Sequence, residues 1–327
     1  MPVQTHANLQ QMFIPVKADF KLPHWPVLTV LVCLVCFGVF MKQESDWRQF
    51  ENAVERYCMK PQSRLTEIIM TRVDEFRNAQ FCGEVMYYVS TSDNEAKEIK
   101  DIVSGLKPLS GFSPEDSREY VTQMLTDELR YFRSIVPDDP DHNFAYYTAS
   151  WNVWHMISSS FAHGGWGHIV FNLIFFLAFA ATVEALIGPV AFVAFILVNS
   201  LIIGVVDSVV SELIDGHHWT LGLSGIVMGM MGLFAYLLPR GKIRCYYWVI
   251  VIFGSVAVPG WMLAGWYIGS DIYQLFSSDD HGAVNVLAHV SGGVSGFFYG
   301  FFFLKGSRML AASLQRDLDK KELTLGV

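Results

Sequence analysis

Six long apolar segments limit what this chain can fold into. They cover residues 25–41, 168–187, 189–210, 222–238, 246–268 and 283–304. A helix that crosses the hydrocarbon core of a bilayer needs about 20 mostly apolar residues, and its backbone polar groups must be paired within the segment. We therefore expect an all-α, polytopic membrane protein with a bundle of six transmembrane helices. The composition agrees, because 52% of the 327 residues are hydrophobic and only 17% are charged.

The first apolar segment is short, and it has two interpretations. A cleaved signal peptide has an apolar core of about 7–15 residues and a small-residue cleavage site. No such site follows Met41, and the apolar run is long for a signal core. We favour a retained transmembrane anchor over a signal peptide.

Charged residues indicate the orientation of the predicted spans. The basic stretches "PRGKIR" at 239–244 and "KGSR" at 305–308 follow the fourth and sixth spans, whereas 269–282 has acids and no lysine or arginine. The positive-inside rule then places both termini in the cytoplasm. We expect a multi-pass protein, most simply of a bacterial inner membrane. We attribute the net charge of −8 mainly to solvated acidic surface in this outer loop, not to a nucleic-acid or metal site.

The loop after the first span is long enough to form a small helical extramembrane domain. The predicted parts are a cytoplasmic segment, the first span, this outer domain, a core of five spans and a cytoplasmic tail, at residues 1–24, 25–41, 42–150, 151–304 and 305–327. Ser113, Pro114 and Asp116 have the pattern of a helix N-terminus, with Ser113 as the N-cap. The apolar stripe of that helix consists of Val121, Met124, Leu125, Leu129 and Phe132. A second amphipathic helix is expected over 63–76, and we expect the stripes to form a domain core.

Cysteine positions leave one disulfide open. Cys58 and Cys82 both fall in the predicted outer loop, which would be an oxidising space, so they could pair or remain as free thiols. No cysteine and histidine pair has the spacing of a zinc site. We expect no metal and no cofactor.

Four polar residues inside the apolar segments are candidates for function, because polar groups in a membrane are costly. They are His168, Asn172, Ser224 and His289. On the predicted topology all four lie toward the outer side, where they could converge. A serine hydroxyl is a weak nucleophile that an adjacent histidine base activates, so Ser224 and His289 are a candidate catalytic pair.

Glycines suggest how the serine and the histidine could approach. Gly225 and Gly229, which are four residues apart, follow Ser224. Gly292 and Gly296, also four residues apart, follow His289. Such small-residue strips let two membrane helices pack closely. Taken singly, Ser224 could be a packing residue and His289 a satisfied polar group.

Three motifs together resemble the rhomboid family of intramembrane serine proteases. They are "HIVFN" at 168–172, "GLSG" at 222–225 and "AHVSGGVSG" at 288–296, which are similar to the family's HxxxN, GxSG and AHxxGxxxG. The resemblance implies that Ser224 is the nucleophile and His289 the base, in a dyad with no acidic third member. It implies oxyanion donors at His168, Asn172 and the Ser224 backbone N–H.

Other positions follow from the same resemblance. Glu184 falls where the family has a glutamate, and its expected role is a structural interhelix hydrogen bond; His163 is also expected to be structural. Two positions depart from the pattern. His155 follows Trp154 where family members commonly have arginine, and Met228 replaces an aromatic residue four positions after the serine.

The loop before Ser224 is polar, with Asp215, His217 and His218. We expect these side chains to keep the entrance of the site wet, as plain surface residues; a metal site is the alternative. Asp207, near the end of the third span, is expected at a solvated helix end.

The resemblance implies a substrate class and leaves other readings open. The expected partners are membrane lipids and a single-pass transmembrane protein whose helix unwinds easily near its outer end, with no nucleic acid. The alternatives are a non-catalytic rhomboid-like protein that binds transmembrane clients, a sortase-like rhomboid that processes a C-terminal anchor, and a transporter. The presence of both Ser224 and His289 favours catalysis, and the absence of internal repeats argues against a transporter.

Overall fold

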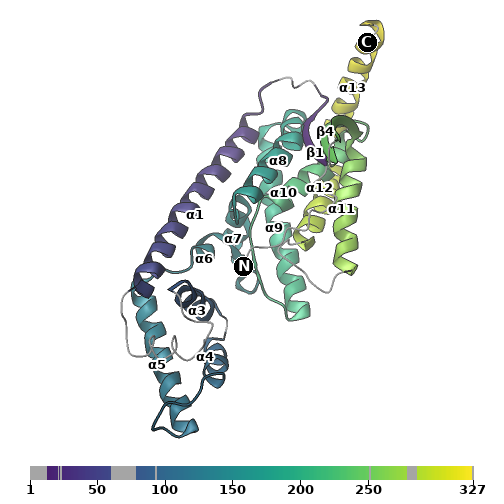
Figure 1. Cartoon of the computed structure of the whole chain (residues 1–327). Helices are drawn as coiled ribbons and strands as arrows, with labels where there is room; N and C mark the ends of the chain where they lie inside the picture. The colour runs from purple at the N-terminus through teal and green to yellow at the C-terminus, as the bar shows by residue number, and fades with distance from the viewer. Residues whose placement is uncertain are drawn as a thin grey trace. The chain divides into compact units, whose positions relative to one another are not determined.

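A computed structural model describes residues 13–20, 22, 24–59, 79–92, 94–249, 252–277 and 286–325. The helix expected over 63–76 lies outside the described residues. The chain divides into two compact units, one made of Met1–Met41 with Phe144–Val327 and the other of Lys42–Asn143. Figure 1 shows the helices of both units.

The first unit is mostly helical. Its main helices are α1 (Val27–Met59, which continues into the second unit), α7 (Val153–Ser158), α8 (Trp166–Ile187), α9 (Pro189–Ile214), α10 (Ser224–Leu237), α11 (Gly260–Ser277), α12 (Val286–Phe303) and α13 (Lys305–Leu325). Within the described residues, α1, α8, α9 and α12 are long and apolar enough to cross a membrane. Three of them, α8, α9 and α12, begin and end within about one turn of the predicted spans.

The short helix α10 is the centre of this unit. It lies among the other helices of this unit (Figure 1) and contacts α8, α9, α11 and α12. All of its residues except Ser224 and Ala235 are buried. A helix that is apolar on every side lies either in a protein core or in lipid, and here the neighbouring helices cover it. The motif "GLSG" therefore lies at the start of the most enclosed helix of the unit.

The expectation of an all-α fold is wrong in two places. The strands β1 (Phe13–Ala18), β4 (Lys242–Val249) and β5 (Ile252–Pro259) form an antiparallel sheet in the order β1-β4-β5. A second, two-stranded sheet pairs β2 (Tyr146–Tyr147) with β3 (Trp219–Thr220). The second pairing ties the segment before α7 to the segment before α10.

The fifth predicted span is accordingly wrong over its first half. Residues 246–249 and 252–259 belong to the hairpin, and the helix begins only at Gly260. The start of β4 has an alternating pattern in the sequence, "KIRCY" at 242–246. In the structure Ile243 and Cys245 are buried, while their neighbours Lys242, Arg244 and Tyr246 are exposed. This alternation, in a segment rich in aromatic and β-branched residues, is typical of a half-buried strand.

The second unit has its own hydrophobic core. It contains the end of α1, then α3 (Ala79–Thr91), α4 (Glu95–Ser104), α5 (Pro114–Ile135) and α6 (Pro140–Phe144). The expected N-terminus of α5 is confirmed, because the Ser113 hydroxyl accepts a hydrogen bond from the Asp116 N–H at 3.1 Å. The predicted stripe on α5 faces the core, with Val121, Leu125, Leu129 and Phe132 all buried.

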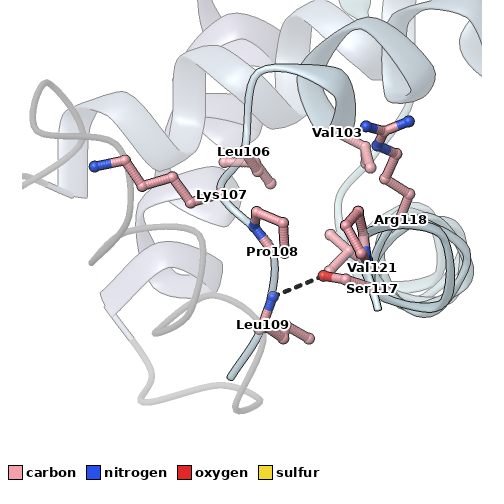
Figure 2. Close-up of a pocket in the computed structure, with 9 residues that line it drawn as sticks. Val103, Leu106, Lys107, Pro108, Leu109, Ser117, Arg118 and Val121 are labelled. Atoms are coloured by element: carbon pink, nitrogen blue, oxygen red, sulfur yellow. Dashed lines mark hydrogen bonds between the residues drawn. The ribbon is translucent and has the colours of Figure 1, made fainter. Parts of the chain in front are cut away.

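A disulfide and a hydrogen bond link segments of this second unit. Cys58 on α1 is bonded to Cys82 on α3, and their Cα atoms are 5.9 Å apart. Figure 2 shows the segment between α4 and α5, where the Leu109 N–H donates to the Ser117 hydroxyl at 2.8 Å beside a small pocket. The disulfide joins α1 to α3, and the hydrogen bond joins the segment before α5 to the first turn of that helix.

Candidate active site

Ser224 is the first residue of α10, and the turn before it requires glycine. Gly222 has a φ of +128°, in the region that side chains rarely adopt. A Cβ atom at Gly222 would also lie 2.8 Å from Cε1 and Nε2 of His168, and 3.8 Å from Ser224 Oγ. The missing side chain therefore leaves the His168 ring and the Ser224 hydroxyl near the same point.

The helix that carries Ser224 packs backbone to backbone against the helix that carries His289. A Cβ atom at Gly292 of α12 would collide with the carbonyl oxygen of Gly225, and one at Gly296 with the carbonyl oxygen of Gly229. A Cβ atom at Gly225 would lie 3.2 Å from the Ala288 carbonyl oxygen. Gly225 and Ala288 are the direct neighbours of Ser224 and His289, so this contact brings the two candidate catalytic residues into one region.

His168 and Asn172 lie one turn apart on α8. The backbone N–H of Gly164 donates to His168 Nδ1 at 3.3 Å, so Nδ1 is an acceptor and the proton of the neutral ring is on Nε2. Nε2 is the atom near Gly222 and Ser224. Asn172 is 7% exposed, and within the described residues its buried Nδ2 has no hydrogen-bond partner. A buried N–H without a partner costs about 1–3 kcal/mol, so this donor is available to an acceptor such as an ordered water or a ligand.

His289 has an acidic neighbour that the sequence analysis did not anticipate. Its Nδ1 lies 3.0 Å from Oδ2 of Asp271 on α11. Asp271 was expected in a solvated acidic loop, but it lies within a helix and is only 3% exposed. The error arises because the predicted span ends at residue 268, whereas α11 continues to Ser277.

A sequence signal for Asp271 existed. Once the helix begins at Gly260, the buried positions of α11 are Gly260, Leu263, Ala264, Tyr267 and Asp271. This spacing of three or four residues is that of one helix face, and the aspartate extends the stripe by one turn. A carboxylate on the buried face of an apolar helix indicates a specific partner.

The expected solvated position of Asp207 is also wrong. Asp207 is fully buried on α9, and its Oδ1 lies 3.3 Å from His218 Nε2. The hydrogen bond to Asp207 raises the pKa of His218 above its ordinary value, against the opposing effect of burial. His218 Nδ1 also lies 3.3 Å from the Gly216 carbonyl oxygen, so both ring nitrogens face acceptors. His218 is thus a surface residue, as expected, with a side chain 43% exposed, and it also anchors the loop before Ser224.

Two backbone contacts complete this anchor. The Thr148 N–H donates to the His218 carbonyl oxygen, and the His218 N–H donates to the Thr148 side-chain hydroxyl, each at 3.1 Å. The neighbouring His217 faces Glu212 at 4.0 Å. In the described part of the chain, no three His, Cys, Asp or Glu side chains are grouped as metal ligands would be.

Two other buried polar residues join helices. The Glu184 carboxylate on α8 accepts hydrogen bonds from the N–H groups of Leu28 and Thr29 and from the Thr29 hydroxyl, at 3.0, 2.7 and 2.7 Å. These N–H groups are in the first turn of α1, where no intrahelical acceptor exists. Asn199 on α9, which the sequence reasoning missed, donates to the Gly292 carbonyl oxygen at 3.2 Å and to the Ser295 hydroxyl at 2.7 Å.

Comparisons with known proteins match the part of the chain that carries this site. The Rhomboid domain family model matches residues 150–306. Rhomboid protease GlpG of Klebsiella pneumoniae is 28% identical over 170 residues, which are 50% of this chain and 51% of the relative. Rhomboid protease GlpG of Haemophilus influenzae is 31% identical over 160 residues, which are 49% of this chain and 74% of the relative.

The chain spans about half the length of the Klebsiella relative. It covers about three quarters of the Haemophilus one, and the matched region contains α8 to α12, from which every candidate catalytic side chain comes. The apolar helices of that region are those of an integral membrane protein. This chain therefore belongs to the rhomboid family.

Proposed function

We propose that this protein is an intramembrane serine protease that cleaves a transmembrane segment of a membrane-anchored protein. The observation that carries the proposal is the glycine contact between α10 and α12, because it brings the neighbourhoods of Ser224 and His289 together. The unpartnered Nδ2 of Asn172 supports it, since a hydrolase of this kind needs a donor that is free before the reaction. The names of the GlpG relatives point to the same activity.

In the proposed reaction, Ser224 Oγ attacks the carbonyl carbon of the scissile peptide bond, and His289 Nε2 accepts the hydroxyl proton. The carbonyl oxygen becomes an oxyanion. His168 Nε2–H, the Asn172 amide and the Ser224 backbone N–H donate to it. His289 then gives its proton to the leaving amine, the C–N bond breaks, and water hydrolyses the acyl-enzyme by the same route, with His289 as base and then as acid.

The length of α10 supports a site within the membrane. Its 14 residues extend about 21 Å, less than the hydrocarbon core of about 30 Å. If the C-terminal end of α10 lies near one membrane–water interface, the helix is too short to reach the opposite interface, so Ser224 lies within the hydrocarbon core. On the orientation inferred from the charges, Ser224 opens toward the outer side, where water is available. A substrate helix must unwind there, because a hydrogen-bonded helix does not present its peptide bonds to a nucleophile.

The direct test uses a fluorophosphonate probe, which reacts with an activated serine and needs no knowledge of the substrate. The purified protein in detergent should be labelled at Ser224 and should cleave a model single-pass transmembrane substrate. Ser224→Ala and His289→Ala should abolish both. Ser200→Ala, which removes another buried serine, should keep both.

Each outcome of this test has a meaning. Cleavage that persists in folded Ser224→Ala protein overturns the assignment. A wild-type protein that binds the substrate without labelling or cleavage is the non-catalytic alternative. Cleavage confined to substrates with a C-terminal anchor is the sortase-like one.

A further inference from the structure

Asn199 lies in the middle of the apolar helix α9, and its amide joins α9 to the helix that carries the expected base. The side chain is 1% exposed. Its Nδ2 donates to the Gly292 carbonyl oxygen at 3.2 Å and to the Ser295 hydroxyl at 2.7 Å, both on α12. The Ser295 hydroxyl donates in turn to the same carbonyl oxygen at 3.0 Å. An amide inside an apolar segment is costly, so these bonds indicate a role that apolar packing does not provide.

The same side chain also lies against α10. A Cβ atom at Gly229 would be 2.7 Å from Asn199 Oδ1 and 2.9 Å from its Cγ and Nδ2, so the amide occupies the space beside this glycine. One turn further along α9, Ile203 covers Gly225 in the same way, because a Cβ atom there would be 2.8 Å from Ile203 Cδ1. The helix α9 therefore packs against both partners of the glycine contact.

The glycine contact sets the distance between α10 and α12, but it has few side chains that interlock. Most helix pairs fix their register, which is the position of one helix along the axis of the other, by inserting side chains of one helix between those of its partner. A single buried asparagine can fix the register instead, as it does in coiled coils. Asn199 is bonded to α12 one turn after His289 and lies against the second turn of α10.

We propose that Asn199 is a positioning residue that fixes the register of α12 against α10, and thereby the place of His289 relative to Ser224. The inference rests on the proposed protease function. Asn199 acts through the backbone of α12 and through Ser295, not on the reacting atoms. Without its bonds α12 can shift along α10, and a displacement of about 1 Å between reacting groups costs about 100-fold in rate.

Asn199→Leu is the informative substitution, because leucine has the same branching at Cγ and no polar atom. It keeps the packing against the glycines and removes both hydrogen bonds. We expect kcat to fall by about 10- to 100-fold, with KM changed by less than about threefold because the lost contact is not made to the substrate. Ser295→Ala removes one of the two acceptors of Nδ2 and should lower kcat less. The double variant should be no slower than Asn199→Leu alone, because both changes act on one contact.

The experiment measures cleavage of a model transmembrane substrate, together with the rate and final extent of fluorophosphonate labelling, on the full chain in detergent. The matched control is Ser200→Ala, at the next position of α9. The buried Ser200 hydroxyl accepts from the Ser160 hydroxyl and donates to the Ile196 carbonyl oxygen, so its bonds do not reach α12. Ser200→Ala should keep the kcat and the labelling rate constant of wild type.

Labelling separates a positioning role from a merely structural one. If Asn199 fixes the register, kcat per labelled site and the labelling rate constant of Asn199→Leu fall while the labelled fraction stays that of wild type. If Asn199 only stabilises the fold, the labelled fraction and the melting temperature fall and kcat per labelled site is unchanged, which overturns the inference. A double variant whose loss is the product of the two single losses also overturns it.

The test remains decisive if Asn199→Leu does not fold. Ser295→Ala then carries it, because its kcat per labelled site should fall below that of wild type, and an unchanged value overturns the inference. An unlabelled and inactive wild-type protein refutes the proposed function itself, which is a distinguishable result.

Discussion

Replacing Gly292 by alanine adds one methyl group at the contact between α10 and α12. The new Cβ atom would collide with the carbonyl oxygen of Gly225, and the Gly225 carbonyl carbon and Cα would lie within 3.4 Å of it. All three atoms belong to the backbone of α10, so no side chain can rotate away. We expect the two helices to separate at this contact, which is close along the chain to Ser224 on α10 and to His289 on α12.

The magnitude follows from two opposing effects. Overpacking a close-packed interior costs about 1–3 kcal/mol, and the upper part of this range applies because the obstacle is backbone. Alanine is a better helix former than glycine by about 1 kcal/mol. We therefore expect a net loss of about 1–2 kcal/mol in the free energy of unfolding. A displacement of about 1 Å between reacting groups costs about 100-fold in rate, so activity should fall much more than stability.

The assay compares kcat on a model transmembrane substrate with thermal unfolding in detergent. The matched control is Gly265→Ala on α11, because a Cβ atom there meets nothing within 4 Å. Gly265→Ala should keep kcat and stabilise the protein by up to about 1 kcal/mol. The packing argument is refuted if Gly292→Ala keeps the wild-type kcat and raises the melting temperature as the control does.

Three further outcomes are expected. Asn172→Ala should lower kcat by about 10- to 1000-fold with KM nearly unchanged, whereas a raised KM with intact kcat would make Asn172 a binding or packing residue. Because Asp207 raises the pKa of His218, the charged pair should stabilise the fold fully below the ordinary histidine pKa of about 6.5, and this stabilisation should be lost as pH rises through the raised pKa. Melting temperatures of wild type and His218→Gln across pH should therefore converge at high pH; a constant difference contradicts the pairing. The Cys58–Cys82 bond closes a loop with a sequence separation of 24, so its reduction should destabilise the second unit by about 3 kcal/mol and leave cleavage intact. Free thiols at both positions in membranes that were never reduced would contradict this expectation.

The sequence alone was sufficient for the features that depend on neighbours along the chain. The limits of α8 and α9 follow from continuous apolar runs, and the start of α5 follows from its Ser113 cap and Pro114. The family could be recognised because each of its motifs needs particular residues at fixed spacing within one short segment of chain. The glycines after Ser224 and His289 indicated that two helices approach closely, because few other roles explain such a strip inside an apolar segment.

Only the tertiary structure decided which residues from different helices meet. The hairpin of β4 and β5 was mistaken for a helix, because apolarity measures burial and does not distinguish a strand from a helix. Asp207 and Asp271 looked like solvated acids, since a sequence does not show whether a partner lies opposite a charged group. Their pairing with His218 and His289 depends on how α9 and α11 pack. A carboxylate can be buried without a large energetic cost only where this packing supplies a partner for it.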